Sequence, residues 1–173
     1  MEIFKPDIYK KSIFDIPYNQ LKEKGILCLV FDLDNTLGLV SDKKCPEKTK
    51  KLLQELKKDF IIVISSNNNN KRLSPYIDDL EIDGVCWSMK PSTKALRKIC
   101  KKYKLKKNEI CMIGDQLVTD ILAGNRFHVK TVLVDPLGKK DLKITSLNRK
   151  IETLILKNYQ KKGLLERGKY YGE

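Results

Sequence analysis

The sequence predicts an α/β fold built on a mainly parallel five-stranded sheet. Short apolar runs alternate with segments of helical periodicity from residue 26 onward, and the 173 residues contain no internal repeat and no Pro- or Ser-rich linker. Strands that alternate with helices are typical of a parallel sheet covered by helices. With 41% hydrophobic and 33% charged residues, the chain has enough apolar material for one core. We therefore expect a single domain over residues 1–173.

Five runs have the length and composition of buried strands. They are short, rich in branched or aromatic residues, and bounded by turn or polar residues: 26–31, 60–64, 84–87, 110–113 and 131–134. Parallel strands that are buried on both faces read as continuous apolar runs. Trp87 ends the third run, and we interpret it as a buried strand residue rather than as an exposed stacking platform.

Helical periodicity fills the intervals between these strands. Apolar residues recur at helical spacing over residues 46–58, 92–103 and 119–125. A turn is expected at 135–138, before a basic amphipathic helix over 144–159 within the C-terminal segment 144–160. Its apolar stripe packs on the core or, as the alternative, faces a membrane; the stripe comprises Leu147, Ile151, Leu154 and Ile155. Residues 1–22 are expected to pack on the central segment 26–135.

Composition excludes several classes of protein. The longest apolar run, residues 26–31, is too short to cross a bilayer. Charged residues interrupt the N-terminus, so no signal peptide is expected, and the prediction is a cytoplasmic protein or one peripheral at the inner membrane face. The five cysteines form no C-x-x-C pair and are interpreted as reduced and mostly buried. His128 is the only histidine, which excludes Ser-His and Cys-His catalysis.

The net charge of +13 lies in the second half of the chain. Residues 1–86 hold 14 basic and 14 acidic side chains, whereas residues 87–173 hold 21 basic and 8 acidic ones. A basic half indicates an anionic partner such as a phosphate, a nucleic acid or a membrane surface. Solvated lysine-rich helix faces explain the same composition equally well.

Two carboxylates follow the first predicted strand. Asp32 and Asp34 lie two residues apart, so an extended backbone aims both side chains the same way, beyond the carboxyl edge of the sheet. Converging carboxylates repel one another unless a cation lies between them, and oxygen ligands suit Mg²⁺. An Asp-rich turn without any ligand is the simpler alternative for this pair taken alone.

Later strand ends add complementary chemistry. Ser66 and Asn67 follow the second strand, Lys90 follows the third, and Asp115 with Asp120 follows the fourth. Carboxyl ends of parallel strands meet at one edge, where ligands bind in open α/β sheets. A nucleophile candidate, a hydroxyl donor, a cation and a second acidic group are therefore expected at one place.

These residues resemble the four ordered motifs of the haloacid dehalogenase (HAD) superfamily of phosphatases. The motifs are residues 32–36, Ser66-Asn67, Lys90-Pro91 and Gly114-Asp115 with Asp120. The sequence is most similar to the subfamily IIIA, YqeG-like branch, which is related to mitochondrial phosphatidylglycerophosphate phosphatase. The residues that support this branch are 12–16, 66–68 with Arg72, 114–116 with 119–120, and 124–126. The resemblance spans about residues 4–160 and implies a Rossmann-like, three-layer HAD fold.

The resemblance also implies roles for these residues. Asp32 is expected to attack phosphorus and form an aspartyl-phosphate, while Asp34 protonates the leaving oxygen and later activates water. Ser66, Asn67 and Lys90 are expected to bind the phosphoryl group, with Ser65 as the alternative to Ser66. The resemblance further implies Mg²⁺ on Asp32, Asp115 and the backbone carbonyl of Asp34, supported by Asp120.

Spacing predicts an open site. Thirty-one residues separate Asp34 from Ser66 and twenty-three separate Ser66 from Lys90, which leaves no room for a cap domain once the expected helices and strand are placed. The site is open unless a neighbouring subunit of a homo-oligomer covers it, and an open site suits a phosphate on a large molecule. Together with the basic second half, the resemblance implies phosphatidylglycerophosphate as the preferred substrate. The alternatives are a phosphatase acting on nucleic-acid ends and a non-catalytic module that binds metal or phosphate.

One further motif is rejected. Residues 163–169 have the glycine spacing of a P-loop, but Tyr170 stands where Ser or Thr would bind Mg²⁺, and no strand precedes the motif. Specific RNA recognition also has little support, because aromatic residues make up only 8% of the chain and are not interleaved with basic ones.

Overall fold

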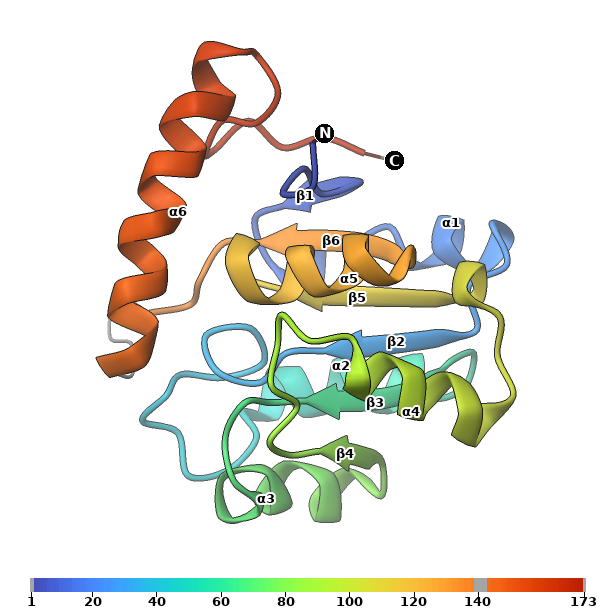
Figure 1. Ribbon diagram of the computed structural model, residues 1–173. Helices are drawn as coiled ribbons and strands as arrows, with labels where there is room; N and C mark the ends of the chain where they lie inside the picture. Colours follow the sequence, from blue (N-terminus) through green and yellow to red (C-terminus); the bar gives the residue numbers. More distant parts are fainter. Residues whose placement is uncertain (1, 139–142, 173) are drawn as a thin grey trace.

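A six-stranded parallel sheet with helices on both faces forms the centre of the computed structural model, which describes residues 2–138 and 143–172 (Figure 1). The order of the strands is β1-β6-β5-β2-β3-β4, and every neighbouring pair is parallel. Their bounds are β1 Ile8–Lys10, β2 Cys28–Phe31, β3 Ile61–Ser65, β4 Asp83–Val85, β5 Ile110–Gly114 and β6 Lys130–Val134. The α/β prediction is confirmed, and the five predicted strands are present with ends shifted by at most two residues.

The prediction of five strands was wrong by one, because the N-terminal segment supplies β1. Ile8 pairs with Val132 and Lys10 with Val134, which places β1 on the outer side of β6. The strand has only three residues, and its first two are both buried. It therefore shows neither the alternation nor the length by which a strand is recognised in a sequence.

Helices cover the two faces of the sheet in separate groups. Leu29 and Phe31 of β2 pack in one cluster with residues of α1 (Tyr18–Glu23), α2 (Glu47–Leu56) and α3 (Asn70–Leu80). Cys28 and Val30 point to the other face and pack with α4 (Lys94–Tyr103) and α5 (Leu122–Phe127). Both faces of β2 are thus buried, as expected for a central parallel strand.

The interpretation of Trp87 as a buried strand residue was wrong. β4 ends at Val85, and Trp87 lies beyond it in a left-handed conformation (φ 48°) with 65% of the residue exposed. The backbone N–H of Trp87 donates to the carbonyl of Asn68 at 2.9 Å rather than to a neighbouring strand. β4 is a short edge strand, so the chain leaves the sheet before Trp87 can be covered.

Helix α3 begins within a run of four asparagines, residues 67–70, whose composition is typical of a polar loop. The Oδ1 atom of Asn69 accepts a hydrogen bond from the backbone N–H of Arg72 at 3.1 Å and caps the helix. An asparagine at this position satisfies one of the free N–H groups of the first turn. The run that reads as a polar loop is therefore also a helix start.

The C-terminal helix α6 (Lys143–Lys161) packs on the domain by a face that shares only Ile155 with the predicted stripe, among the side chains that the structure describes. Tyr159 is buried with Tyr9 and Leu133, and the buried carboxylate of Glu152 accepts a hydrogen bond from the backbone N–H of Leu117. Ile151 and Leu154 of the stripe are exposed. The side chain of Leu147 lies outside the described residues. Packing on the core is confirmed for the described part of the helix, with a corrected face.

Two predictions from composition are supported. All five cysteines are free thiols, and burial raises the pKa of Cys45 to about 11 and that of Cys28 to about 12. Thiols with raised pKa values are poor nucleophiles at neutral pH. Across the described residues, no helix has the length and apolar content needed to span a bilayer.

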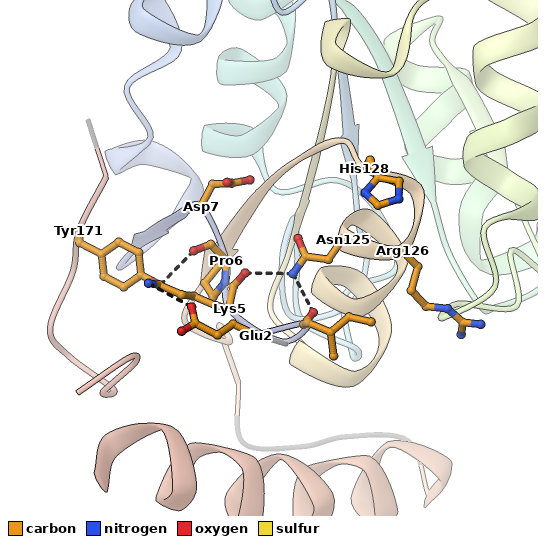
Figure 2. A pocket seen from close by; sticks show the side chains of 9 residues that line it. Glu2, Lys5, Pro6, Asp7, Asn125, Arg126, His128 and Tyr171 are labelled. Atoms are coloured by element: carbon orange, nitrogen blue, oxygen red, sulfur yellow. Dashed lines mark hydrogen bonds and ion pairs between the residues drawn. The ribbon is translucent and has the colours of Figure 1, made fainter. Parts of the chain in front are cut away.

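The N-terminal segment is tied to the domain by Asn125. Its Nδ2 group donates to the carbonyls of Ile3 (2.7 Å) and Lys5 (2.9 Å), and its Oδ1 atom accepts from the hydroxyl of Thr131 (3.2 Å). Figure 2 shows Asn125 in the wall of a cavity of about 880 Å³ that also includes Tyr171. This cavity lies near the start of β1 and β6, at the amino end of the sheet.

Replacing Asn125 should loosen this segment. We expect Asn125→Ala to lower the free energy of unfolding by about 1–3 kcal/mol, because the partly buried carbonyls of Ile3 and Lys5 lose their hydrogen-bond donor. Hydrogen exchange at the amide of Tyr9 should become faster, because β1 depends on this tether. Asn158→Ala, at an exposed position on α6, is the control and should change stability by less than about 0.5 kcal/mol. Unchanged exchange at Tyr9 in Asn125→Ala would contradict the tethering role.

Candidate active site

The predicted site residues lie at the carboxyl edge of the sheet. Asp32 follows β2, Ser66 follows β3 and Asp115 follows β5. The chain builds outward from β2 to β3 and β4 on one side and from β5 to β6 on the other, so the order reverses between β2 and β5. Such a reversal opens a crevice at the carboxyl ends of the two strands, where open α/β sheets bind ligands.

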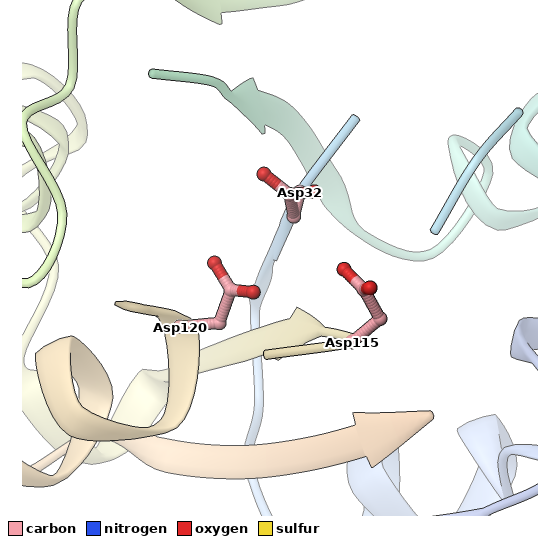
Figure 3. Close-up of side chains that lie close together, drawn as sticks. All are labelled: Asp32, Asp115 and Asp120. Carbon is pink, nitrogen blue, oxygen red and sulfur yellow. The ribbon is translucent and has the colours of Figure 1, made fainter. Parts of the chain in front are cut away.

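Three carboxylates converge at this crevice. One oxygen from each of Asp32, Asp115 and Asp120 lies within 4.8 Å of the others, and all three residues are buried (Figure 3). Asp120 comes from a π-helical turn, η3 (Leu117–Ile121), which follows β5. π-helical turns occur frequently at functional sites.

Gly114 makes room for the carboxylate of Asp120. A Cβ atom at position 114 would lie 2.3 Å from the Cγ atom of Asp120 and 2.4 Å from its Oδ2 atom. Separations below 3.0 Å cannot be accommodated without movement. The glycine at the end of β5 is therefore a steric condition for the three-carboxylate cluster.

Lys90 places its ammonium group inside the cluster. The Nζ atom forms ion pairs with Asp32 and with the Oδ1 atom of Asp120 (2.8 Å), and it donates to the carbonyl of Ser65 at 2.8 Å. Only 3% of the side chain is exposed. Burial lowers the pKa of Lys90, but the carboxylates of Asp120 and Asp32 outweigh it and hold the pKa above its usual value.

Asn67 fixes the backbone that carries Lys90. Its Oδ1 atom accepts from the N–H of Lys90 (2.8 Å) and the hydroxyl of Ser88 (2.8 Å), and its Nδ2 group donates to the carbonyl of Lys90 (3.1 Å). The peptide bond between Lys90 and Pro91 is cis. This amide is thus engaged with protein groups, and its predicted role in phosphate binding stays a prediction.

The charges of the cluster suit a divalent cation. Counted over Asp32, Asp115, Asp120 and Lys90, the ionised side chains sum to two negative charges. Burial raises the pKa of Asp32 well above its usual value; Lys90 lowers it, and Asp120 and Asp115 raise it further. A hard cation bound by carboxylate oxygens would offset this repulsion, and the donor set fits Mg²⁺.

The side chain of Asp34 lies outside this cluster. Its Oδ1 atom accepts from Arg72 through Nε (2.9 Å) and Nη2 (2.8 Å), and its Oδ2 atom accepts from the Nδ2 group of Asn68 (2.6 Å). The two carboxylates therefore have different partners in the structure: Asp32 pairs with Lys90, and Asp34 pairs with Arg72. The backbone carbonyl of Asp34 stays a predicted metal ligand.

Ser66 and Ser65 have different surroundings. The hydroxyl of Ser66 accepts from the backbone N–H of Asn68 at 3.1 Å, just beyond β3. Ser65 is the last residue of β3, and its carbonyl accepts from Lys90. Both residues are buried. The choice of Ser66 as the phosphate ligand stays a prediction.

Two residues at the site have contacts that the sequence pattern does not reveal. Arg72 binds Asp34 and also donates to the carbonyls of Leu39 (2.9 Å) and Asp42, which joins α3 to the loop after β2. Thr36 donates its hydroxyl to the Oδ1 atom of Asp115 at 3.2 Å. The only sequence signal for Arg72 is its place in the resemblance, because its partners come from loop carbonyls.

Comparison with protein families matches most of the chain to hydrolases. A haloacid dehalogenase-like hydrolase family matches residues 29–90, and a HAD-hydrolase-like family matches residues 88–153. Together the two matches run from β2 into α6 and include every predicted site residue.

Two curated relatives are similar over nearly the whole chain. The probable phosphatase YqeG of Bacillus subtilis is 37% identical over 166 residues, which cover 95% of this chain and 96% of that protein. Phosphatidylglycerophosphate phosphatase 1, chloroplastic/mitochondrial, of Arabidopsis thaliana is 28% identical and covers 92% of this chain. The matched region is about half the length of the Arabidopsis protein (49%).

Solved structures share the fold at low sequence identity. An uncharacterized protein from Listeria monocytogenes serotype 4b has a TM-score of 0.54 at 14% identity and covers 75% of this chain and 99% of its own. A HAD family enzyme from Bacteroides thetaiotaomicron, solved as a magnesium complex, has a TM-score of 0.52 at 14% identity and covers 70% of this chain and 98% of its own. These matches establish a common architecture.

Crowding at Gly114 gives a test of the cluster. We expect Gly114→Ala to raise the Mg²⁺ concentration for half-maximal binding by tenfold or more, because the added methyl group displaces Asp120. Gly84→Ala, on the edge strand β4, is the matched control. Its Cβ atom would lie 2.7 Å from the Cδ2 atom of Leu73 in α3, so the crowding is similar but lies away from the cluster. It should lose stability with an unchanged Mg²⁺ midpoint. Titration calorimetry measures the Mg²⁺ midpoint of each variant, and thermal unfolding measures its stability. Equal midpoints in the two variants would contradict the role of Gly114.

Proposed function

Since this chain belongs to the haloacid dehalogenase-like hydrolases and is a phosphatase of that superfamily, we propose that it hydrolyses a phosphomonoester through an aspartyl-phosphate on Asp32. The observation that carries the proposal is the buried cluster of Asp32, Asp115 and Asp120 around the ammonium group of Lys90. A carboxylate that both accepts and releases a phosphoryl group needs positive charge beside it, and the ammonium group of Lys90 supplies such a charge next to Asp32.

The reaction proceeds in two displacements on phosphorus. A carboxylate oxygen of Asp32 attacks and the ester P–O bond breaks. The leaving oxygen takes the proton of Asp34, whose carboxyl group must be protonated when the substrate binds. Water then attacks the phosphorus of the aspartyl-phosphate and gives its proton to Asp34. The bond between phosphorus and Asp32 breaks, inorganic phosphate leaves, and both aspartates return to their starting states.

The surrounding groups stabilise the charge on the phosphoryl group. Lys90 faces Asp32 from the buried side and balances the developing charge, and the hydroxyl of Ser66 is a donor at the same edge. Mg²⁺ would be held by Asp32, Asp115 and the carbonyl of Asp34 with support from Asp120, and it would supply positive charge to offset the negative charge of the phosphoryl group. Arg72 and Asn68 hold the carboxyl group of Asp34 in a fixed position.

The substrate we propose is phosphatidylglycerophosphate or a similarly large phosphorylated molecule. Residues 32–46 join β2 to α2, and only Glu81 and Ile82 separate α3 from β4, so these described connections contain no separate domain over the site. A relative of this chain is named for phosphatidylglycerophosphate hydrolysis. The basic second half suits an anionic surface, and we place the enzyme peripherally on a membrane.

A panel of phosphate esters tests this function. With Mg²⁺, we expect phosphate release to be fastest from phosphatidylglycerophosphate in mixed micelles and slower from sugar phosphates, nucleotides and 5′-phosphorylated oligonucleotides. Asp32→Asn should lower the rate by about a thousandfold or more. Asp59→Asn, an exposed acid paired with Lys22, is the matched control and should keep full activity. If phosphate is released fast from oligonucleotides alone, the substrate is a nucleic-acid end and not a lipid. Equal rates in Asp32→Asn and the wild type would exclude catalysis by Asp32.

The ion pair between Arg72 and Asp34 gives a second test, which depends on the leaving group. We expect Arg72→Ala to lower kcat for an alkyl phosphate by about tenfold to a hundredfold, because the acid that protonates the alkoxide loses its position. With p-nitrophenyl phosphate the loss should be much smaller, since nitrophenolate leaves without a proton. Lys71→Ala, an exposed neighbour, is the control and should change neither rate. Equal losses with both substrates would mean that Arg72 has no specific effect on the acid.

A further inference from the structure

Four exposed apolar residues lie on loops that follow strands at the carboxyl edge of the sheet. We name this set the apolar rim: Leu39 (39% exposed), Trp87 (65%), Met89 (65%) and Leu137 (46%). Single exposed apolar residues are common, whereas several of them at one place on a protein surface indicate a site of association.

Backbone contacts bring all four rim residues to the catalytic edge. The N–H of Trp87 donates to Asn68, whose side chain binds Asp34. The N–H of Leu137 donates to the carbonyl of Asn35 at 2.9 Å. The carbonyl of Leu39 accepts from Arg72, which also binds Asp34, and Met89 directly precedes Lys90. The backbones of all four rim residues therefore lie at the catalytic edge.

The loop before Lys90 holds two rim residues outward. Trp87 and Met89 both have left-handed backbones, with φ of 48° and 54°, while Ser88 and Lys90 between and after them are buried. The hydroxyl of Ser88 is fixed by Asn67. A left-handed conformation is costly for a bulky residue and persists where the surroundings impose it. Apolar side chains thus point to solvent while the catalytic lysine points inward.

Positive charge borders the rim. From Gly84 to Asn108 the sequence contains nine Lys and Arg residues and no Asp or Glu. Helix α4 starts beside Met89, whose carbonyl accepts from the N–H of Ser92 at 2.8 Å, and its early turns expose Lys94, Arg97 and Lys98. Apolar side chains with a tryptophan, flanked by exposed cations, are the composition of surfaces that lie in an anionic lipid interface.

We propose that the apolar rim docks the catalytic edge onto the surface of an anionic bilayer. Trp87 and Met89 enter the interfacial region, and the exposed cations of α4 contact the headgroups. The proposal deepens the proposed function and rests on it for the benefit to catalysis, since docking brings a headgroup phosphate to Asp32. A second copy of the chain fits less well, because a two-fold contact would bring the basic α4 helices together. Nucleic acid gains little from the burial of Met89, Leu39 and Leu137.

Trp87 is the only tryptophan in the chain and reports on its own environment. In EDTA, so that no metal-dependent turnover occurs, we expect vesicles of phosphatidylcholine with 25% phosphatidylglycerol to shift its emission to shorter wavelength and protect it from acrylamide. Vesicles of phosphatidylcholine alone should have little effect, and salt should weaken the anionic response.

Matched leucine and methionine variants locate the surface. Met89→Ala should weaken binding to the anionic vesicles about tenfold, through the loss of buried apolar area. Leu154→Ala removes a residue of similar exposure (68%) on α6 and should bind as the wild type does. A larger loss in Leu154→Ala than in Met89→Ala would assign the membrane contact to α6 and overturn the proposal.

Other outcomes separate this proposal from the proposed function. A spectral shift that grows with protein concentration without vesicles would identify a second copy as the occupant, and one produced by an oligonucleotide but not by anionic vesicles would identify nucleic acid. Either result overturns membrane docking. Phosphate release from a soluble ester without any vesicle response contradicts docking alone. Vesicle binding by a protein that releases no phosphate contradicts the proposed function alone.

Discussion

The ammonium group of Lys90 lies buried between the carboxylates of Asp32 and Asp120, and the carboxyl edge is built around this contact. Removing ions from water costs several kcal/mol for each ion, so such a cluster persists only with close geometry and compensating charge. Asn67 holds the backbone of Lys90 on both sides, and Gly114 leaves the space that Asp120 occupies. Three carboxylates and one ammonium group leave a net negative charge in the cluster, and this charge is the physical reason to expect a divalent cation.

The residues that make this contact are positioned by the central strands of the sheet. β2 and β5 are central strands with all their residues buried, and they fix Asp32 and Asp115 at the point where the strand order reverses. The second acid, Asp34, is held separately by Arg72, which also gathers the loop after β2. The described connections contain no separate domain above the site, and the residues of the apolar rim lie on loops at the same edge of the sheet. In our account a membrane surface therefore takes the place of a cap.

The sequence is most informative where local pattern and burial agree. Buried strands read as apolar runs, so the sequence alone predicts that Asp32, Ser66, Lys90 and Asp115 share one edge of the sheet. β1 is missed because three residues without alternation carry no periodic signal. Trp87 is misplaced because composition does not reveal that the edge strand ends at Val85. The role of Arg72 depends on carbonyls brought together by folding, and the packing face of α6 depends on a buried glutamate, Glu152, that amphipathic periodicity counts as polar.

The central claim is that Asp32 receives the phosphoryl group within a cation-binding cluster. A crystal structure of the protein with Mg²⁺ and beryllofluoride tests it most directly, because beryllofluoride mimics a phosphoryl group attached to a carboxylate. Our account predicts beryllofluoride on Asp32, the ammonium group of Lys90 beside its fluorides, and Mg²⁺ bound by Asp32 and Asp115. Beryllofluoride on another residue, or Mg²⁺ bound away from these carboxylates, would contradict it.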